Sequence, residues 1–490
     1  MQKSINQIIS LYQDNKCNTE VLDKITSFIC DRLPIEVVCW KKDFDKNKIN
    51  HEKGKFISDF LNEESNQYYY IEETEMFIKY DNLNYSLINE DELLYLILSE
   101  ISKNKLLLSK KQQIKDIIIK EIKTNKFGSG IPDSNTIQNI INYFYPVLFK
   151  TKSEAKYFLC ILGDNILRKN INMYYFMRSN SEVFLNHINN CFNDYYNYKI
   201  NSNFHYNIQN LTKQLNYEDI RLKMRILDFK QSINNTRFWK HFLEQNVLNI
   251  ISVAIHYSGR YDNSEEYLNH KIEDKEKILY LKNNTKDDII EKFTKKNICK
   301  EKGKNITKNE LYYIWELFLI EENIPSIFEV KGLFYEKFNK INKIIDINNY
   351  YLDLFSDKLL VARQFNLFWN NNMTEQQNDV IEISEIFYFF KQQTNIKTSS
   401  EKEIILIIEY FYPYIKISNK RYINNHSCVL WNKKQTIRDV INKIAEKENI
   451  ENITNMKLYK KYCQYLKKMK NELVVNKTYF MDVINYIKNL

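Results

Sequence analysis

Glycine and proline are scarce in this sequence, with 7 glycines and 5 prolines in 490 residues. Both residues mark turns and interrupt helices, so their scarcity argues against a fold of many tight turns and favours a mainly helical chain. Hydrophobic residues still make up 44% and aromatic residues 14%, which is enough for packed cores and excludes a wholly disordered chain. At this length we expect several domains.

Long apolar runs are also missing. The richest stretch, residues 246–255, is about half the length of a membrane span, so we expect no membrane among the partners. The N-terminal residues lack the apolar segment and cleavage site of a signal peptide. The 8 cysteines form no C-x-x-C pair and no regular framework, which indicates reduced thiols in a cytosol-like compartment. We find no metal site, and we expect no cofactor.

Arginine is rare, with 10 arginines against 61 lysines, and asparagine and isoleucine are frequent, as an AT-rich genome would produce. The distribution of charge along the chain is more informative than this bias in amino-acid composition. Residues 414–490 contain 16 basic and 6 acidic side chains, whereas residues 1–413 contain 55 and 56. Genome bias would spread lysine evenly, so this segregation predicts a neutral body and a basic C-terminal domain that attracts polyanions.

Four domains are predicted along the chain. Residues 33–88 contain short aromatic and β-branched runs that are typical of strands, the first of them "LPIEVVCW". Together with a first helix they predict a small antiparallel β/α domain over residues 1–105. Capping patterns predict helices that begin at Asn89 with Glu92, Thr151 with Glu154, Thr285 with Asp288 and Thr307 with Glu310. The helices of the later stretches predict a helical domain over 106–300 and a helical middle domain over 308–375. The polar, lysine-rich stretch 295–308 is interpreted as a linker between them.

The last domain, residues 380–490, has the order helix, turn, helix, hairpin that is typical of a winged helix, a common nucleic-acid-binding module. Its basic residues would line the hairpin, its exit and the helix that follows. A lysine face exposed only to solvent is the simpler interpretation of the same residues, and the sequence does not decide between the two. The candidate nucleic-acid-binding residues are Lys416, Lys420, Arg421, Lys433, Lys434, Lys457, Lys460, Lys461, Lys467 and Lys468.

Two further patterns were weighed. Tyr312, Leu317 and Phe318 fit Tyr-x-x-x-x-Leu-Φ, the helix by which partners bind the cap-binding translation factor, although any buried amphipathic helix can match so short a pattern. Residues 256–266 concentrate His, Ser, Arg and acids, but Ser258 lacks the turn that exposes a nucleophile, so a helix end is the better interpretation. No Gly-Lys-Ser/Thr phosphate loop occurs, and we expect a non-enzymatic protein with no catalytic residues.

Four stretches carry a resemblance: "EMFIKYDNLNYSLINEDELLYLILSEI", "VAIHYSGRYDNSEEYL", "IWELFLIEENIP" and "SCVLW". They resemble a family of uncharacterised proteins of giant DNA viruses related to mimiviruses, from about residue 68 onward. The first stretch is also similar to the small domain before the helicase of poxvirus-type primase–helicases, which can end in a winged helix. The ATPase loop of those proteins is absent here. The resemblance implies a location in the host cytoplasm, at a viral factory, or in the virion.

Two functions follow as hypotheses. The first is a nucleic-acid-binding protein of a giant virus, serving replication, transcription or translation, that holds DNA or RNA through the phosphate backbone. Because arginine is so rare, bidentate reading of bases is disfavoured. The second is a helical adaptor or scaffold that recruits other viral or host proteins.

Overall fold

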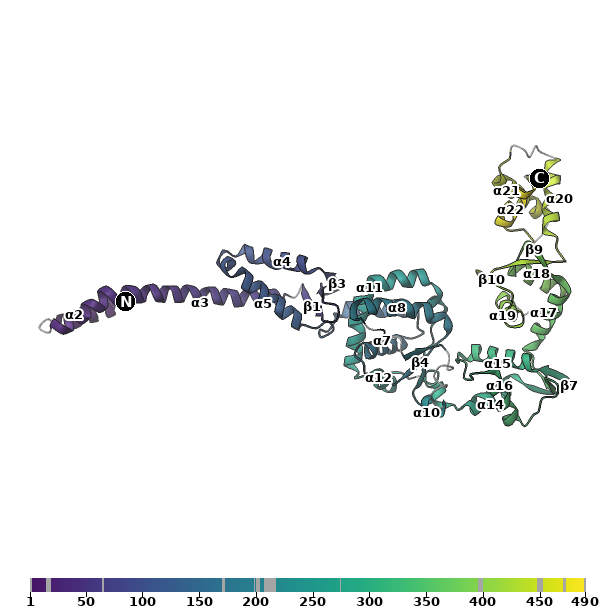
Figure 1. Ribbon diagram of the computed structural model, residues 1–490, viewed down its shortest axis with the longest axis horizontal. Coiled ribbons are helices and arrows are strands. Elements are labelled where there is room, and N and C mark those ends of the chain that lie inside the picture. Colours follow the sequence, from purple (N-terminus) through teal and green to yellow (C-terminus); the bar gives the residue numbers. More distant parts are fainter. Residues whose placement is uncertain are drawn as a thin grey trace. The chain divides into compact units, whose positions relative to one another are not determined.

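The computed structural model describes residues 2–14, 19–63, 66–169, 172–197, 199, 203–206, 217–273, 275–394, 400–446, 453–469 and 473–488. The chain divides into two compact units, Met1–Asn283 and Asn284–Leu490. Helices dominate both units (Figure 1), which confirms the predicted mainly helical class. In these described ranges, no helix combines the length and the apolar character that a membrane crossing requires.

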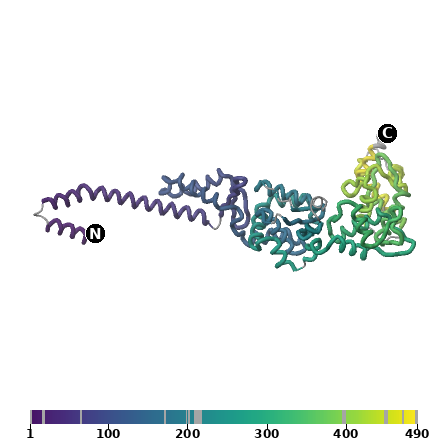
Figure 2. The backbone as a smooth tube through the Cα atoms, turned by 60° about the horizontal axis from the view of Figure 1, so that its bottom comes forward, coloured from purple at the N-terminus to yellow at the C-terminus, as the bar shows by residue number. Residues whose placement is uncertain are grey.

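The first unit begins with a helical arm, and part of it corrects a prediction. Helix α1 (Gln2–Asp14) is followed by α2 (Thr19–Ser27), a π-helical turn (Phe28–Arg32) and α3 (Leu33–Leu61), and the last three run on as one helix (Figure 2). The sequence "LPIEVVCW", predicted as a strand, therefore lies in a helix. Proline is tolerated in the first turn, and the charged helix formers that follow propagate the helix through the β-branched residues.

The predicted small antiparallel sheet is present in the next segment. Strands β1 (Gln67–Ile71), β2 (Met76–Tyr80) and β3 (Tyr85–Ile88) form a sheet in that order. It packs with α4 (Glu90–Lys103) and α5 (Lys111–Thr124), whose isoleucines recur every four residues and are buried. A short 3₁₀ helix, Lys105–Lys110, joins these two helices.

Helices surrounding a small parallel sheet complete the first unit. The strand order is β5-β4-β6, and all three strands are short. Helices α7 and α11 pack closely at Gly163, where no side chain separates the two backbones. The elements are α6 (Ser134–Phe144), α7 (Lys152–Ile166), β4 (Tyr174–Phe176), α8 (Glu182–Tyr196), β5 (Phe204–His205), α10 (Tyr217–Arg221), β6 (Met224–Ile226), α11 (Thr236–Arg260), α12 (Ser264–Lys271) and α13 (Tyr280–Asn283).

The second unit opens with a module of three helices and two strands, here called the first module. It contains α14 (Lys286–Asn297), β7 (Cys299–Thr307), α15 (Lys308–Glu322), α16 (Lys331–Asn342) and β8 (Tyr350–Phe355). Strand β7 pairs with β8 in antiparallel fashion. The stretch 295–308, predicted as a linker, is thus the end of α14 followed by a strand, because its pairing partner lies some 50 residues downstream, where local sequence gives no sign of it.

A second module and three terminal helices complete this unit. The second module contains α17 (Leu359–Asn372), β9 (Met373–Glu382), α18 (Ile383–Gln393), α19 (Glu401–Phe411), β10 (Ile417–Ser418) and β11 (Tyr422–Cys428). Its antiparallel strands are arranged in the order β10-β11-β9. The terminal helices α20 (Lys433–Ala445), α21 (Asn455–Lys468) and α22 (Lys477–Lys488) share a separate apolar core.

The two modules repeat the same structural positions 75 residues apart, which no sequence pattern had suggested. Asn297 ends the first helix of its module and donates its side-chain amide to the carbonyl of Phe293 at 3.1 Å. Asn372 does the same toward Phe368 at 2.9 Å. Both asparagines are buried, so the bond satisfies an amide that has left water.

The hairpins of the two modules match as well. In the first module, Lys308 begins α15, and its backbone N–H donates to the carbonyl of Asn349 at 2.9 Å. In the second module, Ile383 begins α18, and its backbone N–H donates to the carbonyl of Arg421, also at 2.9 Å. Each bond fixes the start of the second helix against the residue before the last strand. The modules therefore share connectivity and register, with different lengths between their second and third helices.

An ion pair joins each module to the helix that follows it. Glu310 completes a capping box at the start of α15, and its carboxylate oxygen lies 2.6 Å from Nε of Arg363 in α17. Glu385 occupies the same position in α18 and pairs with Lys433 in α20. A carboxylate at this helix position thus caps its own helix and holds the next element.

The first of these pairs predicts a pH-dependent effect. Burial alone would raise the pKa of Glu310, but hydrogen bonds from Arg363 and Thr307 outweigh it, so the pKa is lowered. A lowered pKa means that the pair stabilises the fold above the unfolded-state pKa, and that this contribution is lost as the pH falls through the folded-state value. We expect Arg363→Ala to lower the free energy of unfolding by about 1–2 kcal/mol at neutral pH. The loss should shrink as the pH falls below the unfolded-state pKa of Glu310 and should nearly vanish once the pH is below its lowered folded-state pKa.

Urea unfolding of the full chain at neutral and acid pH measures this loss, with Arg438→Ala as the control because Arg438 is an exposed arginine of α20. An equal loss for Arg363→Ala at both pH values would contradict the prediction.

Candidate nucleic-acid interface

Helix α21 separates an apolar face from a cationic one. Leu458, Tyr462 and Leu466, spaced four residues apart, are buried against α20 and α22. The helix has no acidic residue. At about 100° per residue, its five lysines fall within an arc of about 120° on the side away from that core. These residues, here called the α21 lysine face, are Lys457, Lys460, Lys461, Lys467 and Lys468.

The exposure of this face fits a surface contact. Lys457, Lys460, Lys467 and Lys468 are exposed, and Lys461 is half-buried. Because the apolar residues opposite are packed, the helix cannot rotate its lysines away from one another. The result is two groups of lysines on the same side of a rigid helix, Lys457, Lys460 and Lys461 near its start and Lys467 and Lys468 at its end, with Gln464 between them.

The hairpin of the second module holds three more of the predicted cations, which differ in availability. Lys416 and Lys420 are exposed, and Lys420 lies in the turn, where it and Asn419 have positive φ. Two such residues give the hairpin a turn that suits the twist of its strands. Nη2 of Arg421 lies 2.9 Å from Oε2 of the buried Glu382, so the charge of Arg421 is already compensated within the module.

The two lysines at the start of α20 have opposite surroundings. Lys433 is buried, pairs with Glu385 and donates to the carbonyl of Val380 at 2.8 Å. Its ammonium also lies over the rings of Trp431 and Tyr479. Lys433 therefore holds the terminal helices to the second module and is not available to a phosphate, which corrects its predicted role.

Lys434, the neighbour of Lys433, is half-buried on the same helix. The predicted set thus falls into the α21 lysine face, the two hairpin lysines, the half-buried Lys434, and two internally paired cations, Arg421 and Lys433.

The predicted partner helix is not available for docking. Tyr312 and Phe318 are buried in α15, where Phe318 packs on Phe293 and Trp315 and Tyr312 packs on Phe334. Leu317 is half-buried. These side chains build the core of the first module, so a partner could reach them only by unfolding it.

In residues 256–266 the two serines, Ser258 and Ser264, are buried and join a hydrogen-bond network around Asp164. Ser258 is fully buried, and its hydroxyl donates to the Asp164 carboxylate at 2.6 Å. The other Asp164 oxygen accepts the backbone N–H of Ser264, also at 2.6 Å. Burial raises the pKa of Asp164, while its hydrogen bonds to Ser258 and Ser264 act in the opposite direction. His256 is half-buried, and burial lowers its pKa. The network ties α7 to α11 and α12.

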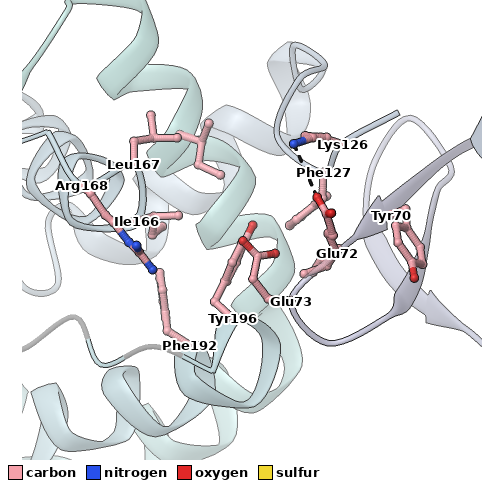
Figure 3. Close-up of a pocket in the computed structure, with 12 residues that line it drawn as sticks. Tyr70, Glu72, Glu73, Lys126, Phe127, Ile166, Leu167, Arg168, Phe192 and Tyr196 are labelled. Carbon is pink, nitrogen blue, oxygen red and sulfur yellow. Dashed lines mark ion pairs between the residues drawn. The ribbon is translucent and has the colours of Figure 1, made fainter. Parts of the chain in front are cut away.

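A cavity of about 310 Å³ in the first unit was not anticipated from the sequence (Figure 3). Glu72 and Glu73 lie on one side of it, and Lys126 is 3.6 Å from Glu72. Arg168 lines the opposite side, and Tyr196 lies beside Glu73 (Figure 3). Burial raises the pKa of Tyr196, and the charge of Glu73 adds to that shift. Two acids and two cations leave no surplus charge, so the lining does not favour an anion or a cation. In the part of the chain that is described, no cluster of His, Cys, Asp and Glu could hold a metal.

Comparisons with known proteins give no further assignment. No family model matches the chain, and neither a curated protein nor a solved structure matches it.

Sequence reasoning missed the 75-residue repeat and the pairing of Glu310 and Glu385 with later cations. The available signal was a glutamate at the third helical position of α15 and of α18, each followed by a basic residue about 50 positions later.

Proposed function

We propose that the second unit binds the sugar–phosphate backbone of DNA or RNA and that the α21 lysine face is its principal contact. The observation that supports this most strongly is the gathering of five lysines, and no acid, on one side of a packed helix. Each lysine that meets a phosphate releases counterions, which provides affinity without reading sequence. Such a protein would serve replication, transcription or translation of a giant virus.

The second module supports the same proposal through its connectivity. Its order of helix, strand, two helices and two strands, with the first and last strands paired, resembles that of a winged helix, although it covers residues 359–428 and not the predicted 380–490. Modules of that kind insert their third helix into the major groove, but α19 carries Glu401, Glu403 and Glu409 against one lysine, Lys402. Acids on that helix would repel a duplex, so we assign binding to α21 and to the hairpin lysines.

The α21 lysine face predicts affinity that depends on salt and on two named lysines. Binding of the full chain to a fluorescent duplex and to a single strand, followed by polarisation, should weaken steeply as salt rises. If four lysines meet phosphates, the slope of log K against log salt is about −4 on duplex DNA. Lys460→Glu/Lys467→Glu should reduce affinity by about 30-fold or more and make the slope shallower by about two.

The matched control is Lys340→Glu/Lys402→Glu, which makes the same change in net charge at exposed lysines of α16 and α19. It should retain binding within a few-fold. Equal losses in both variants would mean that only net charge matters, and a loss confined to the control would move the contact to the third helices. Either result, or binding that is insensitive to salt, contradicts the proposal.

The alternative, an adaptor that recruits viral or host proteins, no longer has Tyr312 and Phe318 as its docking site. Nuclease treatment before pull-down separates the two functions, because partners held through nucleic acid are then lost and direct protein partners remain.

A further inference from the structure

The helical arm has an apolar surface that the described chain does not cover. We use the name arm helix for the continuous stretch made by α2, Phe28–Arg32 and α3. None of its described residues is buried, and α1 is likewise exposed. Only the end of α3 packs on the rest of the unit, where Phe56, Ile57, Phe60 and Leu61 join the core under α4 and α5. At 1.5 Å per residue the arm helix is about 65 Å long.

Apolar side chains follow the arm helix at helical spacing. One stripe recurs on average about every 3.7 residues, close to the 3.6 of an α-helix, so it stays on one side of a straight helix. Within α3, Ile35 and Val38 fall on the side opposite this stripe at about 100° per residue, so the helix has two apolar faces. The residues of the stripe are Leu22, Ile25, Ile29, Leu33, Val37, Trp40 and Phe44.

Helix α1 supplies a matching stripe. Ile5, Ile8, Ile9 and Tyr12 recur at the spacing of one helical face, and all are more than 40% exposed. A helix that is apolar on two faces gains its stability from neighbours on both of them. One α1 can cover one face of an arm helix, which leaves the other face for a second long helix.

We propose that this second helix comes from another copy of the chain, so that two arms form a four-helix bundle with α1 and the arm helix of each copy. On α1 and the arm helix, twelve large apolar side chains are more than a third exposed. Covering them in both copies removes on the order of 2,000 Å² from water, a sum that includes the contact of each α1 with an arm helix as well as the contact between the two arm helices. A standard stable interface buries roughly 1,600 Å², so the bundle as a whole reaches the size of a stable interface.

The charge of the arm favours a second copy over other partners. Residues 19–48 contain six acidic and six basic side chains, and α1 contains Lys3 and Asp14. A neutral surface gives no attraction to nucleic acid or to an anionic membrane, both of which select cationic helices. Two neutral arms also approach each other without repulsion, whereas like-charged arms would oppose association.

Sedimentation of the full chain tests this inference. At concentrations from about 1 to 100 μM the wild type should approach twice the 59.5 kDa chain mass, because association follows mass action. Val37→Glu/Trp40→Glu should sediment as a monomer. Asn47→Glu/Asn50→Glu, which adds the same charge to exposed polar positions beyond the stripe, should remain dimeric. A monomeric wild type, a dimeric Val37/Trp40 variant or an assembly of more than two copies would overturn the proposal.

Tryptophan fluorescence supplies a second readout that needs no arm variant. Trp40 is 59% exposed, Trp239, Trp315 and Trp369 are buried, and Trp431 is half-buried. In the dimer Trp40 should be protected from acrylamide, and dilution should expose it over the concentration range in which the mass halves. A dimer in which acrylamide still quenches Trp40 readily would show that the arm is not the interface. Neither result depends on nucleic-acid binding.

Discussion

Replacement of Lys433 by alanine is expected to destabilise the C-terminal part of the second unit by about 3–5 kcal/mol, because it leaves a buried carboxylate without its partner. Lys433 and Glu385 are each 6% exposed at the side chain. Burial raises the pKa of Glu385, and the charge of Lys433 acts against that shift. Removing the lysine also leaves the carbonyl of Val380 without its donor and takes a cation from the ring of Tyr479.

Lys434→Ala is the matched control, because Lys434 is adjacent and only half-buried. Its replacement is expected to lower the free energy of unfolding by less than about 0.5 kcal/mol. Urea unfolding of the full chain, followed by hydrogen exchange of α20, measures both variants. Glu385→Gln/Lys433→Met should recover much of the loss, because it removes both charges and keeps similar volumes. Equal stability of Lys433→Ala and Lys434→Ala would contradict the assignment of Lys433 as a structural cation.

Helix starts are the part of the fold that the sequence predicts best. Thr151 with Glu154, Thr285 with Asp288 and Thr307 with Glu310 were each expected to begin a helix, and each forms a capping box. A box involves residues three apart, so all of its information is local. Asn89 also begins its helix as predicted, although its side chain makes no cap hydrogen bond.

Strand pairing is where local sequence was insufficient. The stretch 299–307 is polar and lysine-rich and was interpreted as a linker, yet it pairs with β8. "LPIEVVCW" has the composition of a strand, yet no partner strand exists for it in the described part of the chain, and the adjoining helix extends through it. Partners distant in sequence decide both outcomes, and such partners leave no trace in a short window.

The sequence was enough to locate the lysines of the candidate site. It was not enough to tell which of the predicted cations are exposed and which are paired inside the protein. The four-residue spacing of Leu458, Tyr462 and Leu466 is enough to place the lysines of α21 opposite a core. Nothing near Lys433 and Lys434 distinguishes a buried cation from its neighbour, because Glu385 lies 48 residues earlier than Lys433. The same limit explains Arg421, whose partner Glu382 belongs to another strand.

Replacement of Gly163 by alanine is expected to destabilise the first unit by about 2–4 kcal/mol, because a methyl group has no space where α7 meets α11. A Cβ at this position would overlap the carbonyl oxygen of Ala254 and lie 2.7 Å from Cβ of Ser258. The backbone of α11 cannot yield as a flexible side chain would. Moving the helices apart would also stretch the hydrogen bond from Ser258 to Asp164.

The chain offers a close control for this change in Gly259, which is a helical glycine of α11. Gly259 is exposed, and a Cβ there would meet nothing within 4 Å. Since alanine is a better helix former than glycine, Gly259→Ala should leave the first unit unchanged or stabilise it by up to about 1 kcal/mol. Thermal and urea unfolding measure the stability of both variants. Gly163→Ala reports the steric cost of the methyl group, and Gly259→Ala reports the gain in helix propensity from the same substitution. If Gly163→Ala were as stable as Gly259→Ala, the two helices would not be in close contact at Gly163, and the buried network around Asp164 could not depend on that contact.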